Sequence, residues 1–150
     1  MDKFFPTDLA VTANVDAAAA AARLQALSRE SGLRPLQLGG KTLIPVVQGG
    51  MGVGVSAGGL AGTVASLGGV GTISSVDLRR LHPDLMALTG HLDKEPDARQ
   101  LIDAANLEGL DREIRRAREI AQGRGLIAVN VMKALSAYEA YVRQALASGA

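Results

Sequence analysis

The chain has 150 residues, 47% of them hydrophobic and 21% charged, which is typical of one globular domain and excludes a disordered chain. The 16 Lys and Arg residues nearly balance the 15 Asp and Glu residues, and this net charge of +1 favours a small-molecule partner over nucleic acid or a membrane surface. Cysteine is absent, which excludes disulfides, thiolate metal sites and cysteine nucleophiles.

The first 40 residues are expected to form an N-terminal helical extension. They lack an uninterrupted apolar segment of the length that a secretory signal needs, so we expect a cytoplasmic protein. Asp16 can cap a helix that begins with the alanine run at residues 17–22, and Gly32 is its expected end. Residues 41–150 are then expected to form the main domain.

Residues 42–76 carry no charge, and this stretch could be a membrane-spanning helix or several short elements. Gly50, Gly54, Gly58 and Gly62 match the small-residue spacing of packed membrane helices. However, 10 of the 23 residues from 49 to 71 are glycine, and each costs about 1 kcal/mol relative to alanine in a helix. The glycines therefore favour short elements separated by turns.

Cutting the uncharged stretch at its glycines predicts a parallel strand, helix and strand. Residues 43–48 are a β-branched run typical of a buried strand, with Pro45 near its start. Residues 49–55 form a glycine-rich turn, Ser56 can cap a helix that continues to residue 67, and residues 70–74 predict the next strand. Such short connections produce a right-handed crossover between parallel strands.

The charged residues 76–106 are expected to form a surface insertion with a short helix at residues 83–89. His82 and His91 lie in this segment, and we expect both to be solvated loop histidines. No metal site is expected, because these are the only two imidazoles and no cysteine is available.

The C-terminal part predicts a helix, a strand and a second helix. An apolar stripe with charges on the outer face predicts the first helix, and it consists of Leu107, Leu110, Ile114, Ala117 and Ala121. Residues 126–131 repeat the buried-strand pattern. Ser136 and Glu139 form a capping box that begins the last helix, which runs to Leu146 before Gly149 ends it.

The turn after the first predicted strand is a candidate binding site, because ligands gather at the carboxyl ends of parallel strands. Its glycines let backbone donors closely approach an anion or a planar ring. A tight turn with close helix packing is the alternative. The residues assigned to the site are Gln48, Gly49, Gly50, Met51 and Gly52.

Asn130 is the second candidate, because it follows the third predicted strand. A buried amide without partners costs about 1–3 kcal/mol, so Asn130 is expected to hydrogen-bond a ligand or its own loop. Lys133, three residues further on, could neutralise a phosphate or be an exposed loop lysine.

A dinucleotide-binding fingerprint offers a different interpretation of the same turn. Gly52, Gly54 and Ala57 match the Gly-x-Gly-x-x-Ala form, and Asp77 would have to serve as the ribose partner. The match begins beyond the strand end, so a Rossmann-type module stays the alternative.

Taken together, the motifs resemble one family of flavoenzymes. The segment from Pro45 through Gly52, the helix that opens at Ser56, and the Gly-Gly-Val-Gly-Thr-Ile run at residues 68–73 resemble the N-terminal part of nitronate monooxygenases, also called 2-nitropropane dioxygenases. Asn130, in a Val-Asn-Val-Met sequence, is similar to that family's third-strand asparagine. Enoyl-reductase-like and IMP-dehydrogenase-like barrels share parts of this pattern.

The resemblance implies an FMN-dependent α/β protein with a parallel TIM-type (β/α)8 barrel that oxidises alkyl nitronates with O2 to a carbonyl compound and nitrite. The backbone of Gly49, Gly50 and Met51 would lie against the flavin, and Asn130 would hydrogen-bond it. The family's catalytic histidine and second phosphate-binding loop belong to later strands, so the histidine is expected beyond residue 150.

An N-terminal helix and about three βα units do not close a barrel of the roughly 250 residues typical of this fold. We therefore expect residues 41–150 to be the N-terminal part of an incomplete barrel, and the chain to be a fragment. Its exposed sheet edges predict association, for example as a homo-oligomer.

Overall fold

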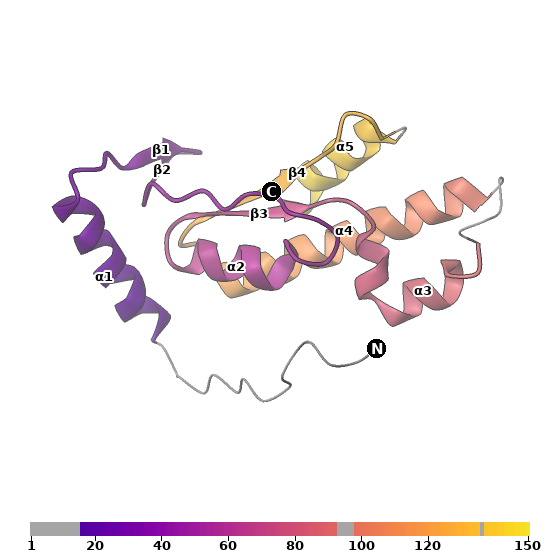
Figure 1. The fold of residues 1–150 in the computed structure, drawn as a ribbon, viewed down its shortest axis with the longest axis horizontal. Helices are drawn as coiled ribbons and strands as arrows, with labels where there is room; N and C mark the ends of the chain where they lie inside the picture. Colours follow the sequence, from indigo (N-terminus) through magenta and orange to yellow (C-terminus); the bar gives the residue numbers. More distant parts are fainter. Residues whose placement is uncertain (1–15, 93–97, 136) are drawn as a thin grey trace.

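The computed structural model describes residues 16–92, 98–135 and 137–150, and a small parallel sheet lies at its centre (Figure 1). Strands β3 (Val70–Ser74) and β4 (Leu126–Asn130) pair in parallel, with Val70 opposite Leu126 and Ser74 opposite Asn130. Val47 joins the other edge of β3 through a parallel bridge to Val70. The protein is thus a mixed α/β structure with strands in parallel, as the sequence predicts.

The first predicted strand needs a correction, because residues 43–48 do not form one continuous strand. Only the end of this run pairs with β3, where the N–H of Gln48 donates to Val70 and the N–H of Val70 donates to Val46, both at 2.9 Å. Its beginning belongs to strand β2 (Lys41–Leu43), which pairs antiparallel with β1 (Leu36–Leu38). The chain bends between the two pairings.

The β1–β2 hairpin contacts the amino-terminal end of β4. Gly39 and Gly40 both have positive φ, at 56° and 72°, which is the geometry that a tight two-residue hairpin turn requires. The ammonium group of Lys41 donates to the carbonyl oxygens of Gly123 and Gly125 at 2.7 and 2.9 Å. The predicted boundary between residues 40 and 41 lies at the turn of this hairpin.

Helix α1 (Ala17–Glu30) lies at the same end of the molecule as the hairpin (Figure 1). The carboxylate of Asp16 accepts from the N–H of Ala18 at 2.9 Å, which confirms the predicted cap. Gly32 follows the helix with a φ of 73°, so its end is also as predicted.

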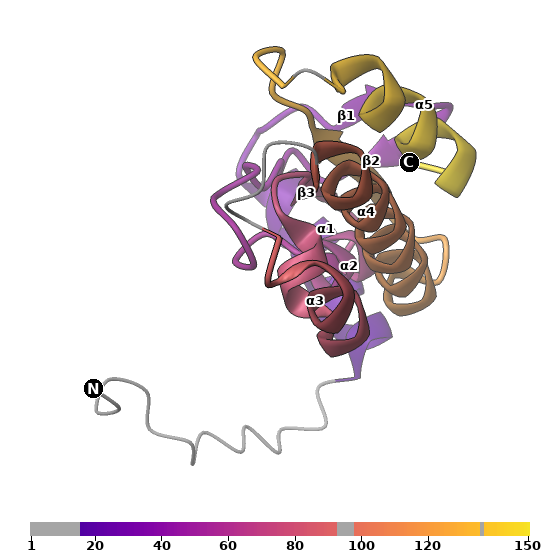
Figure 2. The ribbon, with the colours of Figure 1, turned by 90° about the vertical axis from the view of Figure 1, so that its right-hand side faces the viewer.

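Three helices pack together to bury the core: α2 (Gly58–Ser66), α4 (Arg99–Ala121) and α5 (Tyr138–Ser148). Figure 2 looks along α4 and shows this helix running beside the sheet. The core consists of Ala61, Ala65, Ile73, Leu78, Leu110, Ile114, Ala117, Ala121, Ile127, Tyr141 and Ala145. It confirms the predicted apolar stripe, whose residues 110, 114, 117 and 121 are buried.

The segment expected to be a surface insertion is instead packed against α4. It forms the short helix η1 (Leu78–Leu81) and α3 (Pro83–Thr89), the latter as predicted. Leu78 and Arg79 are only 0% and 2% exposed. Close approach is possible because α4 presents Gly109, where a Cβ would lie 2.9 Å from the backbone nitrogen of Arg79. α4 also begins at Arg99, well before the predicted stripe.

Helix α5 ends as the sequence predicts, while its predicted capping box involves Ser136, which lies outside the described residues. Gly149 has a φ of 91° and follows Ser148, so the helix extends slightly beyond Leu146. In the described ranges, every helix is too short or too polar to cross a membrane.

Candidate functional site

The glycine loop (residues 49–55) lies at the carboxyl end of the parallel sheet, between the Val47 bridge and α2. The chain leaves the edge of β3 at Gln48 and returns to it at Ser56, whose carbonyl oxygen accepts from the N–H of Ser74 at 2.9 Å. Between these points, the side-chain oxygen of Gln48 accepts from the N–H of Thr72 at 2.9 Å. The edge of β3 therefore stays hydrogen-bonded although the chain has looped out.

Ser56 forms hydrogen bonds inside this loop. The sequence predicts that it caps α2, and this prediction is wrong. Its hydroxyl oxygen accepts from the N–H of Met51 at 2.8 Å and from the side-chain amide of Gln48 at 3.0 Å. The hydroxyl in turn donates to the carbonyl of Gly49 at 3.2 Å. The N-cap of α2 is Ala57, which has no side-chain acceptor. The hydroxyl of Ser56 therefore stabilises the loop, and the N-terminus of α2 is capped instead by a side chain of α4, Glu113.

Asn130 reaches the glycine loop from the end of β4. Its amide donates to the carbonyl of Gly50 at 3.2 Å, so its partner in the structure is the glycine loop, which is neither the ligand nor the residue's own loop that the sequence predicts. Asn130 is also exposed rather than buried, because it is the last residue of an edge strand. A Cβ at position 50 would lie 2.5 Å from the Cβ of Asn130, so only glycine fits this contact. Gly50 of the predicted turn and Asn130 of the predicted third strand are thus neighbours.

The loop leaves several backbone donors available. Among the described residues, no hydrogen bond engages the N–H groups of Gly49, Gly50 or Gly52, whereas the N–H of Met51 is taken by Ser56. A Cβ at Gly49 or Gly52 would meet no atom within 4 Å. The side chain of Met51 is half exposed. The loop therefore presents free donors beside open space, which suits a planar or anionic group.

The N-terminus of α2 is occupied by a carboxylate of the protein itself. Glu113 on α4 is 2% exposed, and its side chain accepts from the N–H of Gly58 at 2.6 Å. The other carboxylate oxygen lies 3.4 Å from Nε2 of His82. A helix N-terminus attracts anions, and Glu113 fills that role here.

Sequence analysis missed Glu113 and misplaced His82. The side chain of His82 is 16% exposed and is therefore not a solvated loop histidine, whereas His91 is exposed as expected. The available signal was the position of Glu113 directly beside Ile114 and three residues after Leu110, both in the apolar stripe. An acid on the buried side of a helix requires a partner.

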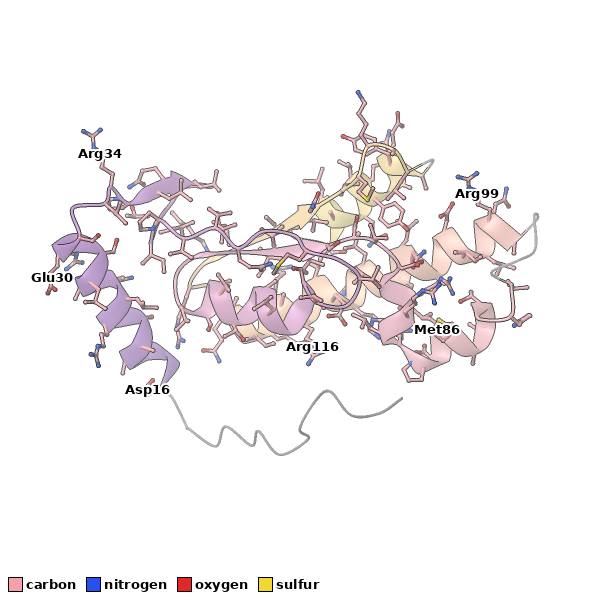
Figure 3. The ribbon with its side chains drawn as sticks, viewed as in Figure 1. Asp16, Glu30, Arg34, Met86, Arg99 and Arg116 are labelled. Carbon is pink, nitrogen blue, oxygen red and sulfur yellow. The ribbon has the colours of Figure 1, made fainter. Side chains whose placement is uncertain are left out.

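A hollow of about 500 Å³ adjoins the Glu113 and His82 pair, and its wall includes Gly54, Val55 and Arg116. Arg116 points outward from the helices in this region (Figure 3). The hollow lies on the α2–α4 side of the loop, while Gly50 and Asn130 meet on the sheet side.

The remaining candidates do not join the loop. Lys133 is exposed in the segment after β4. Asp77, the required ribose partner of the dinucleotide interpretation, pairs with Arg80 at 3.0 Å and lies 3.7 Å from Arg79. Asp77 and the N-terminus of α2 thus both have protein partners in this structure, and the dinucleotide interpretation stays an alternative.

Comparisons with protein-family models, curated proteins and solved structures find no match for this chain. Within the described ranges, no three His, Cys, Asp or Glu side chains gather in a way that could hold a metal ion. The glycine loop with Asn130 is therefore the candidate site on the strength of its own geometry.

Proposed function

We propose that this chain is the FMN-binding part of a flavin-dependent oxidoreductase of the (β/α)8 class, with alkyl nitronates and O2 as substrates. One observation carries the proposal. A braced glycine loop with free backbone donors meets Asn130 at the carboxyl end of a parallel sheet, which is where proteins with parallel α/β sheets bind ligands. The nitronate substrate rests on the resemblance of the loop and its flanking strands to nitronate monooxygenases.

The residues of the loop fit a flavin in specific ways. The N–H groups of Gly49, Gly50 and Gly52 have no acceptor among the residues that the structure describes and can donate to ring or phosphate oxygens, and Met51 offers an exposed apolar side chain. Asn130 holds the carbonyl of Gly50 and can also contact the ring edge. When bound, FMN supplies the electron acceptor for substrate oxidation. The protein contributes the oriented donors and an apolar surface.

FMN titration of the purified 150-residue chain tests the cofactor assignment. We expect saturable quenching of flavin fluorescence, and we expect Gly50→Ala to weaken binding about tenfold or more, because its Cβ would displace Asn130 and remove a hydrogen bond. Gly59→Ala is the matched control, since a Cβ there would meet only Arg116, at 3.8 Å. A folded wild-type chain that does not bind FMN would contradict the proposal.

Nitronate binding to the FMN-loaded chain tests the substrate class separately, because the catalytic histidine is expected beyond residue 150 and turnover is not required of this chain. Addition of an alkyl nitronate should shift the visible absorbance of the bound flavin in a saturable way, and free FMN should show no such shift. Binding of FMN without this nitronate-dependent shift would refute the nitronate assignment and retain the flavin site.

A further inference from the structure

We infer that Gln48 and Ser56 are positioning residues, which hold the glycine loop in its ligand-ready shape and do not themselves contact the ligand. This inference rests on the proposed function and changes the role of Gln48, which the sequence places among the cofactor-binding residues. It also assigns a role to Ser56 beyond the helix cap.

The side chain of Gln48 accepts a hydrogen bond that the backbone of a neighbouring strand would otherwise accept. The N–H of Thr72 faces the edge of β3 where the chain has already left the ladder, and the side-chain oxygen of Gln48 accepts its hydrogen bond at 2.9 Å. The amide nitrogen of the same side chain donates to Ser56 and to the carbonyl of Gly49. Both amide protons are therefore used within the protein, which leaves none for a ligand.

Ser56 is fully buried, and its hydroxyl is equally saturated. A serine hydroxyl has one proton and two lone pairs. The proton goes to the carbonyl of Gly49, and the lone pairs accept from Met51 and from Gln48. At 0% exposure, Ser56 is also out of reach of a ligand on the outer side of the loop.

The brace matters because a glycine-rich loop is otherwise flexible. Glycine loses more conformational freedom on ordering than any other residue, and a ligand that has to order the loop pays for that loss in affinity. The hydrogen bonds of Gln48 and Ser56 order the loop when the protein folds, so the free N–H groups of Gly50 and Gly52 are already oriented before a ligand binds. Their loss is expected to weaken FMN binding while the sheet and helices remain.

Amide hydrogen exchange of the ligand-free chain, followed by NMR, tests the brace directly. Ser56→Ala should accelerate exchange at Met51, and Gln48→Leu should accelerate exchange at Thr72, since each loses its acceptor. Gln48→Glu keeps an oxygen for Thr72 and loses the amide donors, so exchange at Thr72 should stay slow. The matched control is Ser66→Ala, whose hydroxyl donates to Thr63 within α2. Unchanged exchange at both amides would overturn the inference.

FMN titration of the same variants tests the effect on the ligand. For Ser56→Ala and Gln48→Leu the dissociation constant should rise about tenfold, the equivalent of one hydrogen bond, while Ser66→Ala should match the wild type. Gln48→Glu, at a half-buried position, supplies a milder variant if the others unfold. Wild-type affinity in folded Ser56→Ala and Gln48→Leu would refute the positioning role and leave the flavin site in place. Lack of FMN binding by the wild type would refute the proposed function, while amide exchange would still decide whether the brace exists.

Discussion

At the scale of single residues, two glycines of the same region should respond oppositely to a methyl group. A Cβ at Gly71 would overlap the carbonyl of Ala61, so α2 would have to move away from β3. We expect Gly71→Ala to lower the free energy of unfolding by about 3 kcal/mol or more. Gly59→Ala, in an open part of α2, should be neutral or raise it by up to about 1 kcal/mol. Urea denaturation measures both, and equal effects would show that α2 does not press on β3.

Glu113 illustrates what a residue-level pattern misses. The charges of α4 suggest a solvated face, and Arg112 and Arg115 do lie on it, paired with Glu108 and Asp111. Glu113 is another charged residue of this helix, but its side chain is buried and accepts a hydrogen bond from the N–H of Gly58. The identity of that partner depends on where α2 packs, which the sequence of α4 does not contain.

At the scale of elements, Asp111 links α4 to α5. Its carboxylate accepts from Arg115 and from the hydroxyl of Ser148, both at 2.6 Å, and from Gln144 at 3.5 Å. The hydrogen bond from Arg115, followed by that from Ser148, lowers the pKa of Asp111 below its ordinary value of 3.8. The carboxylate is thus held in its charged form.

This depressed pKa predicts a specific dependence of stability on pH. The contribution of Asp111 is present above pH 3.8 and is lost as the pH falls through the lower folded-state pKa. Asp111→Asn should therefore be less stable than the wild type at neutral pH, and the difference should shrink below about pH 4. Glu139→Gln, at an exposed pair on α5, is the control. A pH-independent difference in urea denaturation would contradict the assignment.

The helices and strands themselves were largely predictable, because their signals are local. The residue ranges of β3 and α3, the ends of α1 and the glycine after α5 all follow from propensity and capping. The β1–β2 hairpin was missed because its strands are short and half exposed. It is stabilised in part by Lys41, whose partners Gly123 and Gly125 lie far along the chain.

At the scale of the whole molecule, the parallel sheet has two edges without strand partners among the described residues. Val47 lies at one edge and is 62% exposed, and β4 forms the other. Such edges promote pairing with another chain. We expect the 150-residue chain to associate increasingly with concentration in sedimentation velocity.

Val47→Lys should reduce this association, because a charged side chain on an edge strand opposes pairing. The control is Leu101→Lys, which adds the same charge at a 60% exposed position on α4. Equal association of the wild type and both variants would place the contact elsewhere.

The sequence by itself determined the mixed α/β character, the helices with clear apolar stripes, and the position of the glycine loop before α2, because each of these signals spans only a few neighbouring residues. Only the tertiary structure decided how the loop is held. Its contacts join residues 8, 24 and 80 positions apart: Gln48 to Ser56, Gln48 to Thr72, and Asn130 to Gly50. A glutamine looks the same in the sequence whether its side chain binds a ligand or bonds the edge of a strand. Its role is set by the backbone groups that folding brings within hydrogen-bond distance.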